Sequence, residues 1–286
     1  MDRKENFIRA VLLLTAFSAV SVLAVITVFI FAEGTPIMFR RGVGGFLFGL
    51  NWYPGEGRFG LLPMIVGSLE VTLGALLIGV PFALACAVVL TEFSSPRLRN
   101  ILKPVIELLA GIPSVVYGFI GVVVLVPFIR ETFGGPGFSV LAASIVLGIM
   151  ILPTVISISI DALQALPPSY REGALAMGAT RWQTVRMVLL PSARSGIVAS
   201  IILGMGRAVG ETMAVIMIAG NAAAVPRTPL DPVRTLTSNI ALEMSYASGE
   251  HREALFATGV ILFVIIMVLN TLANASSSRR ARGKRG

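Results

Sequence analysis

Six long apolar stretches dominate this sequence. About 20 apolar residues in a helix, rising about 1.5 Å each, cross the hydrocarbon core of a bilayer, so each stretch is long enough to span a membrane. Because the runs are continuous, they predict helices and not the alternating strands of a membrane barrel. Only 13% of the residues are charged, against about 25% in soluble domains, which excludes a soluble enzyme, a disordered chain and a fibrous protein. The stretches are residues 7–31, 64–91, 105–129, 138–160, 196–220 and 254–275.

The first stretch, residues 7–31, has 25 residues. The apolar core of a signal peptide has about 7–15. We therefore expect an uncleaved first transmembrane helix.

Lysine and arginine residues are sorted between alternate connecting segments. The segments on one predicted side, which include both termini, hold 15 of the 23 basic residues when Arg9 at the start of the first stretch is counted with them, and those on the other side hold 7. By the positive-inside rule, both termini are cytoplasmic. The net charge of +8 is thus a topology signal. We expect the basic tail to anchor the chain beside the membrane. Its charge alone is also compatible with nucleic-acid binding.

The spans divide the chain into three parts. Residues 1–63 form the first transmembrane helix and an external loop, and residues 64–275 form a five-helix core that includes a cytoplasmic loop at 161–195. Residues 276–286 form the basic cytoplasmic tail.

The external loop 221–253 carries Leu236, Ile240 and Met244 at helical spacing among polar residues. This pattern predicts a short amphipathic helix. Either the helix packs on the protein or it offers a docking face to an external partner, and the pattern favours neither.

Residues for catalysis or metal binding are lacking in the sequence. Cys86 and His251 cannot build a metal site, and we expect His251 to be a solvated loop residue. Lys4, Lys103 and Lys284 do not follow a glycine-rich phosphate loop, so ATP hydrolysis requires a separate polypeptide.

The cytoplasmic loop 161–195 has the pattern of two short helices joined by a break. Ser169 and Glu172 have the spacing of a capping box at the start of the first helix. We expect the break near Gly178 and a second helix around Trp182. Such an element, anchored to membrane helices on both sides, can move as a lever.

Two charges, Arg207 and Glu211, lie midway along the fifth span. A charge at that depth costs roughly 2.5–3.5 kcal/mol on insertion scales. In a continuous helix, positions i and i+4 share one face, so the two side chains can pair. The pair is either a structural glue between helices, which the small residues Gly206 and Gly210 also support, or the lining of a polar path. We favour the path, in which the planar guanidinium of Arg207 suits an oxyanion such as phosphate.

The cytoplasmic loop resembles the "EAA" coupling loop of bacterial ABC importer permeases. Gly173 and Val188 depart from that pattern, which has Ala and Ile at these positions. The resemblance implies that residues 170–181 form a coupling helix that docks in a cleft of an ATPase subunit. The matching residues are Glu172, Gly173, Ala174, Gly178, Val188, Leu190 and Pro191.

Further stretches resemble the Pst-type phosphate permeases, and among them the PstC subunit more than the paired PstA subunit. They include residues 51–54, 107–119, 206–214 and 238–241. This resemblance implies a type I (MetI-like) permease and a heterodimer with a PstA-like subunit. It also implies a PstB-like ATPase dimer, which binds ATP and magnesium, and an extracytoplasmic PstS-like phosphate-binding protein; the chain itself holds no cofactor.

The same resemblance implies a set of substrate-pathway residues. Pro113 has two readings: it interrupts the helix and frees backbone N–H groups, which favour anions, or it only kinks a packed helix. The predicted pathway residues are Arg207, Glu211, Thr212, Pro113, Ser114 and Tyr117.

Together these features predict an all-α, multi-pass protein of the bacterial inner membrane, with six transmembrane helices. It is expected to form half of the pathway of an ATP-driven phosphate importer that works by alternating access. Two alternatives remain open: a permease for another oxyanion, such as molybdate or sulfate, and a stand-alone channel or secondary transporter with Arg207 and Glu211 as its gate.

Overall fold

The computed structural model describes residues 3–282, and most of this part of the chain is helical. The helices are α1 (Arg3–Arg41), α2 (Val43–Phe48), α3 (Leu62–Val88), α4 (Pro96–Ala110), α5 (Ser114–Ile120), α6 (Val126–Phe133), α7 (Val140–Gln164), α8 (Ser169–Ala176), α9 (Arg181–Thr184), α10 (Leu190–Ser192), α11 (Arg194–Gly210), α12 (Met213–Ile218), α13 (Leu236–Glu243) and α14 (Gly249–Arg282). A 3₁₀ turn, η1 (Pro54–Glu56), and three π-helical segments, η2 (Val89–Phe93), η3 (Gly121–Leu125) and η4 (Val185–Leu189), complete them. Two short antiparallel strands, β1 (Trp52–Tyr53) and β2 (Arg58–Phe59), form a hairpin that the sequence patterns did not predict.

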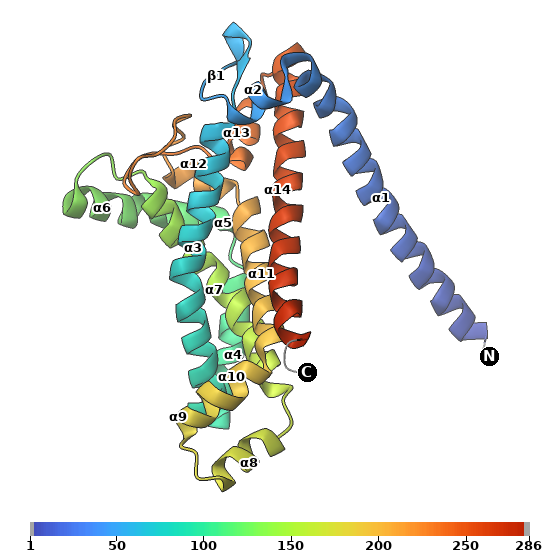
Figure 1. Cartoon of the computed structure of the whole chain (residues 1–286), viewed down its shortest axis with the longest axis vertical. Coiled ribbons are helices and arrows are strands. Elements are labelled where there is room, and N and C mark those ends of the chain that lie inside the picture. Colours follow the sequence, from blue (N-terminus) through green and yellow to red (C-terminus); the bar gives the residue numbers. More distant parts are fainter. Residues whose placement is uncertain (1–2, 283–286) are drawn as a thin grey trace.

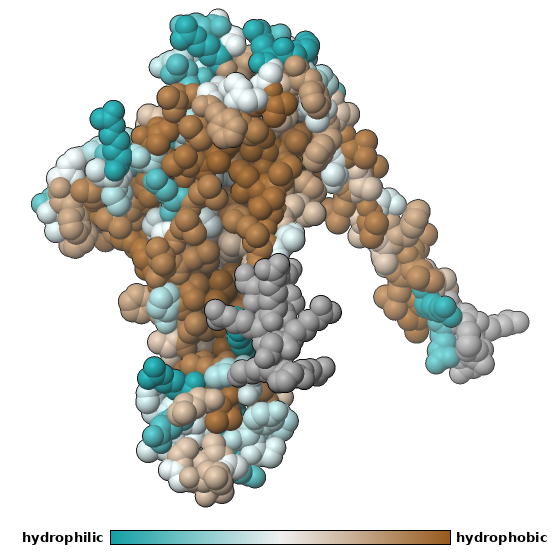
Figure 2. All heavy atoms as spheres, viewed as in Figure 1, coloured by the Kyte–Doolittle hydropathy of each residue, from teal (hydrophilic) through white to brown (hydrophobic). Residues whose placement is uncertain are grey.

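The membrane-spanning helices agree with the predicted six. Within the described residues, five helical stretches are long and apolar enough to cross a membrane, and a sixth candidate is the pair Arg181–Ser192 and Arg194–Gly210, bent by 71°. Apolar residues form a broad band across the middle of the molecule, and hydrophilic residues concentrate at its two ends (Figure 2). We call these the hairpin end, with β1, β2 and α13, and the α8 end (Figure 1).

Helices α3 and α7 form the centre of the bundle (Figure 1). Small residues allow their backbones to approach closely, as is usual between membrane helices. A Cβ on Gly74 would lie 2.2 Å from Ser144 Oγ, and one on Gly79 would lie 2.7 Å from the Gly148 carbonyl oxygen. A larger residue at either glycine therefore requires the two helices to separate. Helices α5, α11 and α12 pack around this pair.

Among the described residues, helix α1 contacts the bundle only through its C-terminal part. There Phe29 and Phe31 make edge-to-face contacts with Phe256 and Phe263 of α14. The backbones approach closely at Gly34, where a Cβ would lie 2.7 Å from the Ala257 nitrogen. The N-terminal part of α1 diverges from the bundle, and its first turns point toward the α8 end (Figure 1).

The predicted tail, residues 276–286, begins inside a helix. Helix α14 runs to Arg282, so the first residues of the tail continue the last membrane helix. Residues 283–286 lie outside the described part of the chain.

Candidate functional site

Two predicted spans are broken helices. The predicted span 105–129 is interrupted between Ala110 and Ser114, and the predicted span 196–220 is interrupted at Glu211 and Thr212. Pro113 explains the first break, since it has no backbone N–H to continue the ladder and its ψ of 137° is extended. Of the two interpretations left open for Pro113, the structure shows an interrupted helix and not a simple kink. That the freed backbone N–H groups favour an anion stays a prediction.

Arg207 lies between the two breaks. Its guanidinium Nη2 lies 3.4 Å from the carbonyl oxygen of Ala110, the last residue of α4, and Nη1 lies 3.4 Å from Thr154 Oγ1 on α7. The last carbonyls of a helix lack intrahelical partners and carry partial negative charge, which suits a cation. Arg207 thus links the end of α4 to α7 at mid-span, and it is half-buried.

Glu211 does not pair with Arg207. Helix α11 ends at Gly210, and Glu211 adopts an extended conformation with a ψ of 131°, so the prediction that the two charges share a helix face is wrong. The carboxylate instead accepts a hydrogen bond of 3.1 Å from the Ala214 N–H in the first turn of α12. Its main-chain oxygen accepts a bond of 2.9 Å from Thr237 on α13. Within the described residues, no ion pair of 4.0 Å or less neutralises Arg207.

The other predicted pathway residues surround the same breaks. Tyr117 donates a hydrogen bond of 3.0 Å to the carbonyl of Leu109, so it caps the end of α4 beside Arg207. Ser114 opens α5, and Thr212 donates a bond of 3.2 Å to the carbonyl of Gly210. The structure therefore gathers the predicted residues around one region, with Tyr117 and Glu211 engaged in holding the broken helices.

The loop after α7 forms the predicted helix–break–helix element at the α8 end (Figure 1). Gly178 has a φ of +83°, which explains the break, since residues with a side chain rarely adopt it. The predicted capping box is wrong: Ser169 is the first residue of α8, and its side chain makes no capping bond. A capping box occurs instead at Thr180 and Gln183, at the start of α9.

The residues that match the coupling-loop pattern divide into two groups. Glu172, Gly173 and Gly178 lie at the exposed tip, where a Cβ on either glycine would meet nothing within 4 Å. Val188 and Leu190 are half-buried and lie next to the 71° bend, which Pro191 precedes. Ala174 lies in α8 and is half-buried.

A bidentate ion pair joins α8 to the membrane helices. Arg171 contacts both carboxylate oxygens of Glu92, at 2.7–3.2 Å, and donates a bond of 3.0 Å to the carbonyl of Leu163 in α7. The bond to Glu92 raises the pKa of the Arg171 guanidinium above its ordinary value. Glu92 lies in η2, directly after α3, so one arginine joins α8 to α3 and α7. The sequence reasoning missed this pair.

A buried polar cluster holds the hairpin end. Glu243 accepts hydrogen bonds of 2.8 Å from Trp52 Nε1 and 2.7 Å from Arg234, and it lies 2.8 Å from His251 Nε2. The prediction that His251 is a solvated loop residue is therefore wrong. Helix α13 is present as predicted, but its polar residues Ser238 and Asn239 are fully buried, which favours packing over a docking face.

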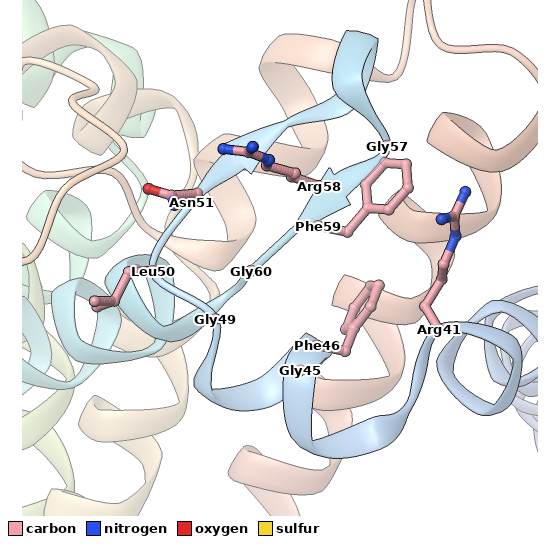
Figure 3. Close-up of a pocket in the computed structure, with 10 residues that line it drawn as sticks. All are labelled: Arg41, Gly45, Phe46, Gly49, Leu50, Asn51, Gly57, Arg58, Phe59 and Gly60. Carbon is pink, nitrogen blue, oxygen red and sulfur yellow. The ribbon is translucent and has the colours of Figure 1, made fainter.

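A pocket of about 350 Å³ lies beside this cluster, between α2 and the β1–β2 hairpin (Figure 3). Phe46 and Phe59 stack on each other in its wall, with ring centroids 6.4 Å apart, and the guanidinium groups of Arg41 and Arg58 do not converge (Figure 3). Arg41 pairs with Glu250 at 2.5 Å and Arg58 with Glu56 at 3.5 Å. Because both cations are neutralised, this pocket is a poorer anion site than the surroundings of Arg207.

Known proteins resemble this chain over most of its length. The model of the family described as "Binding-protein-dependent transport system inner membrane component" matches residues 79–282. The probable ABC transporter permease protein YqgH of Bacillus subtilis is 44% identical over 289 residues, which cover 98% of this chain and 93% of that protein. The phosphate transport system permease protein PstC of Haemophilus influenzae is 36% identical over 268 residues, which cover 86% and 85%.

The fold also occurs in solved structures. An inward-facing structure of the MetNI methionine ABC transporter aligns with a TM-score of 0.57 at 22% identity and covers 78% of this chain and 95% of the compared chain. The likeness agrees with the expected type I permease fold.

Proposed function

Because this chain belongs to the family of binding-protein-dependent inner-membrane transport components, we propose that it forms half of the translocation pathway of an ATP-driven phosphate importer. Permeases of this family are membrane subunits that work with an ATPase and a periplasmic binding protein. The finer assignment is ours: a PstA-like second permease, a PstB-like ATPase that binds ATP and magnesium, and a PstS-like binding protein.

The observation that carries the proposal is the setting of Arg207. Its contacts are a hydroxyl and a carbonyl, both neutral, so its charge remains available to a ligand. A guanidinium binds phosphate through two parallel N–H bonds. Contacts of 3.4 Å are long for hydrogen bonds, and an oxyanion can replace them with shorter, charge-assisted ones.

The breaks beside Arg207 fit this role. Irregular backbone at membrane depth is stable only where it is buried in protein or lines a water-filled cavity, and transporters commonly place broken helices at the binding site. Glu211 and Tyr117 hold the breaks in shape through the Ala214 N–H and the Leu109 carbonyl. We assign them a positioning role and assign Arg207 the contact with the anion.

The helix–break–helix element formed by α8 and α9 supplies the link to the ATPase. Its apolar side chains Tyr170, Leu175, Met177 and Trp182 are exposed, and Met177 retains 89% of its accessible surface. An exposed apolar group with the acidic Glu172 beside it is typical of a protein-docking surface. A stand-alone channel does not dock an ATPase, so this exposed surface argues against the channel alternative.

Alternating access follows from these parts. ATP binding closes the ATPase dimer and moves α8. Through Arg171 the motion reaches the ends of α3 and α7, which opens the surroundings of Arg207 toward the binding protein. Hydrolysis then opens the surroundings of Arg207 toward the cytoplasm.

The direct test is ATP-dependent uptake of labelled phosphate by the full complex in vesicles, with molybdate and sulfate as competitors. We expect excess unlabelled phosphate to abolish the signal and the other two oxyanions to leave it largely intact. Stronger competition by molybdate or sulfate would overturn the assignment to phosphate but leave the importer assignment standing.

A further inference from the structure

A stripe of polar contacts continues from Arg207 along α4 and α7 toward the α8 end. At the next helical turn toward the α8 end, Ser157 of α7 donates a hydrogen bond of 3.4 Å to Glu107 of α4. At the turn after that, Lys103 Nζ lies 2.7 Å from Asp161 Oδ1 and 4.0 Å from Glu107 Oε1. The contacts therefore form successive rungs between the two helices.

Helical geometry makes the stripe continuous. Residues 103, 107 and 110 of α4, and residues 154, 157 and 161 of α7, recur at intervals of three or four, so each set lies on one helix face. From Thr154 to Asp161 the helix rises about 10 Å. The stripe thus leads from mid-span to the end of α7 nearest α8.

The opposite face of α4 has a different character. Ile101, Val105 and Leu108 are exposed and apolar, and helical spacing places them on the side away from Lys103 and Glu107. The side chains of Glu107 and Asp161 are also exposed, by 51% and 59%. Hydrocarbon accepts the first face, whereas the charged face requires water, a polar cavity or a protein interior.

The charges also change along the stripe. Arg207 is a cation without a carboxylate partner among the described residues, whereas Lys103, Glu107 and Asp161 together carry one net negative charge. An oxyanion is therefore attracted at mid-span and is not retained near the α8 end. This arrangement favours release and disfavours rebinding from that side.

We propose that the face made by Lys103, Glu107, Ser157 and Asp161 lines the water-filled exit that leads from Arg207 to the cytoplasm. The proposal rests on the proposed function for the identity of the cargo, but the exit itself is a statement about access of water. It adds four residues to the pathway that the set of predicted pathway residues did not include.

The test uses thiol labelling of the full complex in inside-out membrane vesicles. The single cysteine, Cys86, is first replaced in Cys86→Ala. Ser157→Cys and Glu107→Cys then probe the proposed exit. The matched control is Val105→Cys, which lies within one turn of Glu107 but on the apolar face, with Val105 47% exposed. The reagents are a cationic and an anionic methanethiosulfonate that do not cross membranes.

Because only a hydrated thiolate reacts, we expect Ser157→Cys and Glu107→Cys to be labelled at least about tenfold faster than Val105→Cys in the nucleotide-free complex. At Ser157→Cys the cationic reagent should react faster than the anionic one, and Asp161→Asn should reduce that preference. Ser157→Cys changes only one atom, so it keeps the test valid if Glu107→Cys fails to assemble.

Labelling of Ser157→Cys no faster than Val105→Cys would overturn the exit route, whatever the complex transports. Conversely, rapid labelling in a complex that imports no phosphate would leave the exit route intact and contradict the proposed function. The two failures are therefore distinguishable.

Discussion

Arg171 binds Glu92 with two prongs, at 2.7 Å between Nη2 and Oε1 and at 3.1 Å between Nε and Oε2. One residue belongs to α8 and the other follows α3. The same guanidinium also reaches the carbonyl of Leu163, near the end of α7. We therefore expect movement of α8 to reach both central helices through this one side chain, and not only through the connecting chain.

Glu92→Gln should uncouple the two ends of this link. The amide keeps the size of the side chain but loses the negative charge and one of the two acceptor oxygens, and hydrogen bonds to charged groups contribute about 1.5–3 kcal/mol each when well formed. We expect uptake and stimulation of ATPase activity by loaded binding protein to fall several-fold, with the ATPase still bound. Both are measured on the reconstituted complex.

The control is Arg186→Gln, which changes an exposed arginine of the same loop. An equal loss of uptake in Arg186→Gln and Glu92→Gln would show that coupling depends on the charge of the loop and not on the Arg171–Glu92 pair.

Glu211 distinguishes a positioning role from a charge-pairing role. Its side-chain oxygen caps the first turn of α12 by accepting from the Ala214 N–H, and glutamine also offers an oxygen there. We expect Glu211→Gln to retain most of the uptake and Glu211→Ala to lose it, since loss of such a cap costs about 0.5–2 kcal/mol. Equal, severe loss in both variants would restore the ion-pair model that the structure contradicts.

Gly178 should tolerate asparagine better than alanine or proline. Its φ of +83° costs a residue with a Cβ about 1–2 kcal/mol, asparagine visits that region more readily, and proline cannot reach it. We expect membrane insertion in every case, and co-purification of the ATPase to decrease from Asn to Ala to Pro. Gly173→Ala is the control, because Gly173 is helical and a Cβ there meets nothing within 4 Å. A Gly178→Pro complex with normal uptake would rule out the lever.

Glu243 should be the carboxylate that most stabilises the hairpin end. Glu243→Ala leaves Arg234 half-buried and without its carboxylate partner, and loss of one member of a buried pair costs roughly 3–5 kcal/mol. We expect a clear drop in the Tm of the purified complex. Glu253→Ala removes a more exposed carboxylate, paired with Arg40, and should change Tm little. Equal Tm shifts in the two variants would show that the buried cluster stabilises the complex no more than the exposed ion pair does.

Sequence patterns predicted the spans because continuous apolar runs have few other stable forms. They did not predict that Glu211 leaves the helix: extension of α11 past Gly210 was assumed from hydropathy, which says nothing of backbone angles. At Pro113 the missing N–H acts locally, so the sequence indicated that a break was possible there, but it left a simple kink equally open.

The pairs that the sequence reasoning missed share another cause. Arg171 and Glu92 lie 79 residues apart, and Lys103 and Asp161 lie 58 apart. Each charge alone resembles an ordinary interfacial residue, and only the packing of α4 and α8 against α3 and α7 brings the partners together. His251 was misjudged for the same reason, because its partner Glu243 reaches it only when α13 folds onto the start of α14.

We propose that Arg207 is the mid-membrane contact of the transported anion. The most direct measurement is ATP-driven phosphate uptake by complexes that carry Arg207→Ala or Arg207→Lys and that retain both ATPase binding and basal ATP hydrolysis. We expect a loss of uptake of at least about tenfold for Ala, and partial retention for Lys, which keeps the charge but not the planar fork. Normal uptake by an assembled Arg207→Ala complex would contradict this role of Arg207.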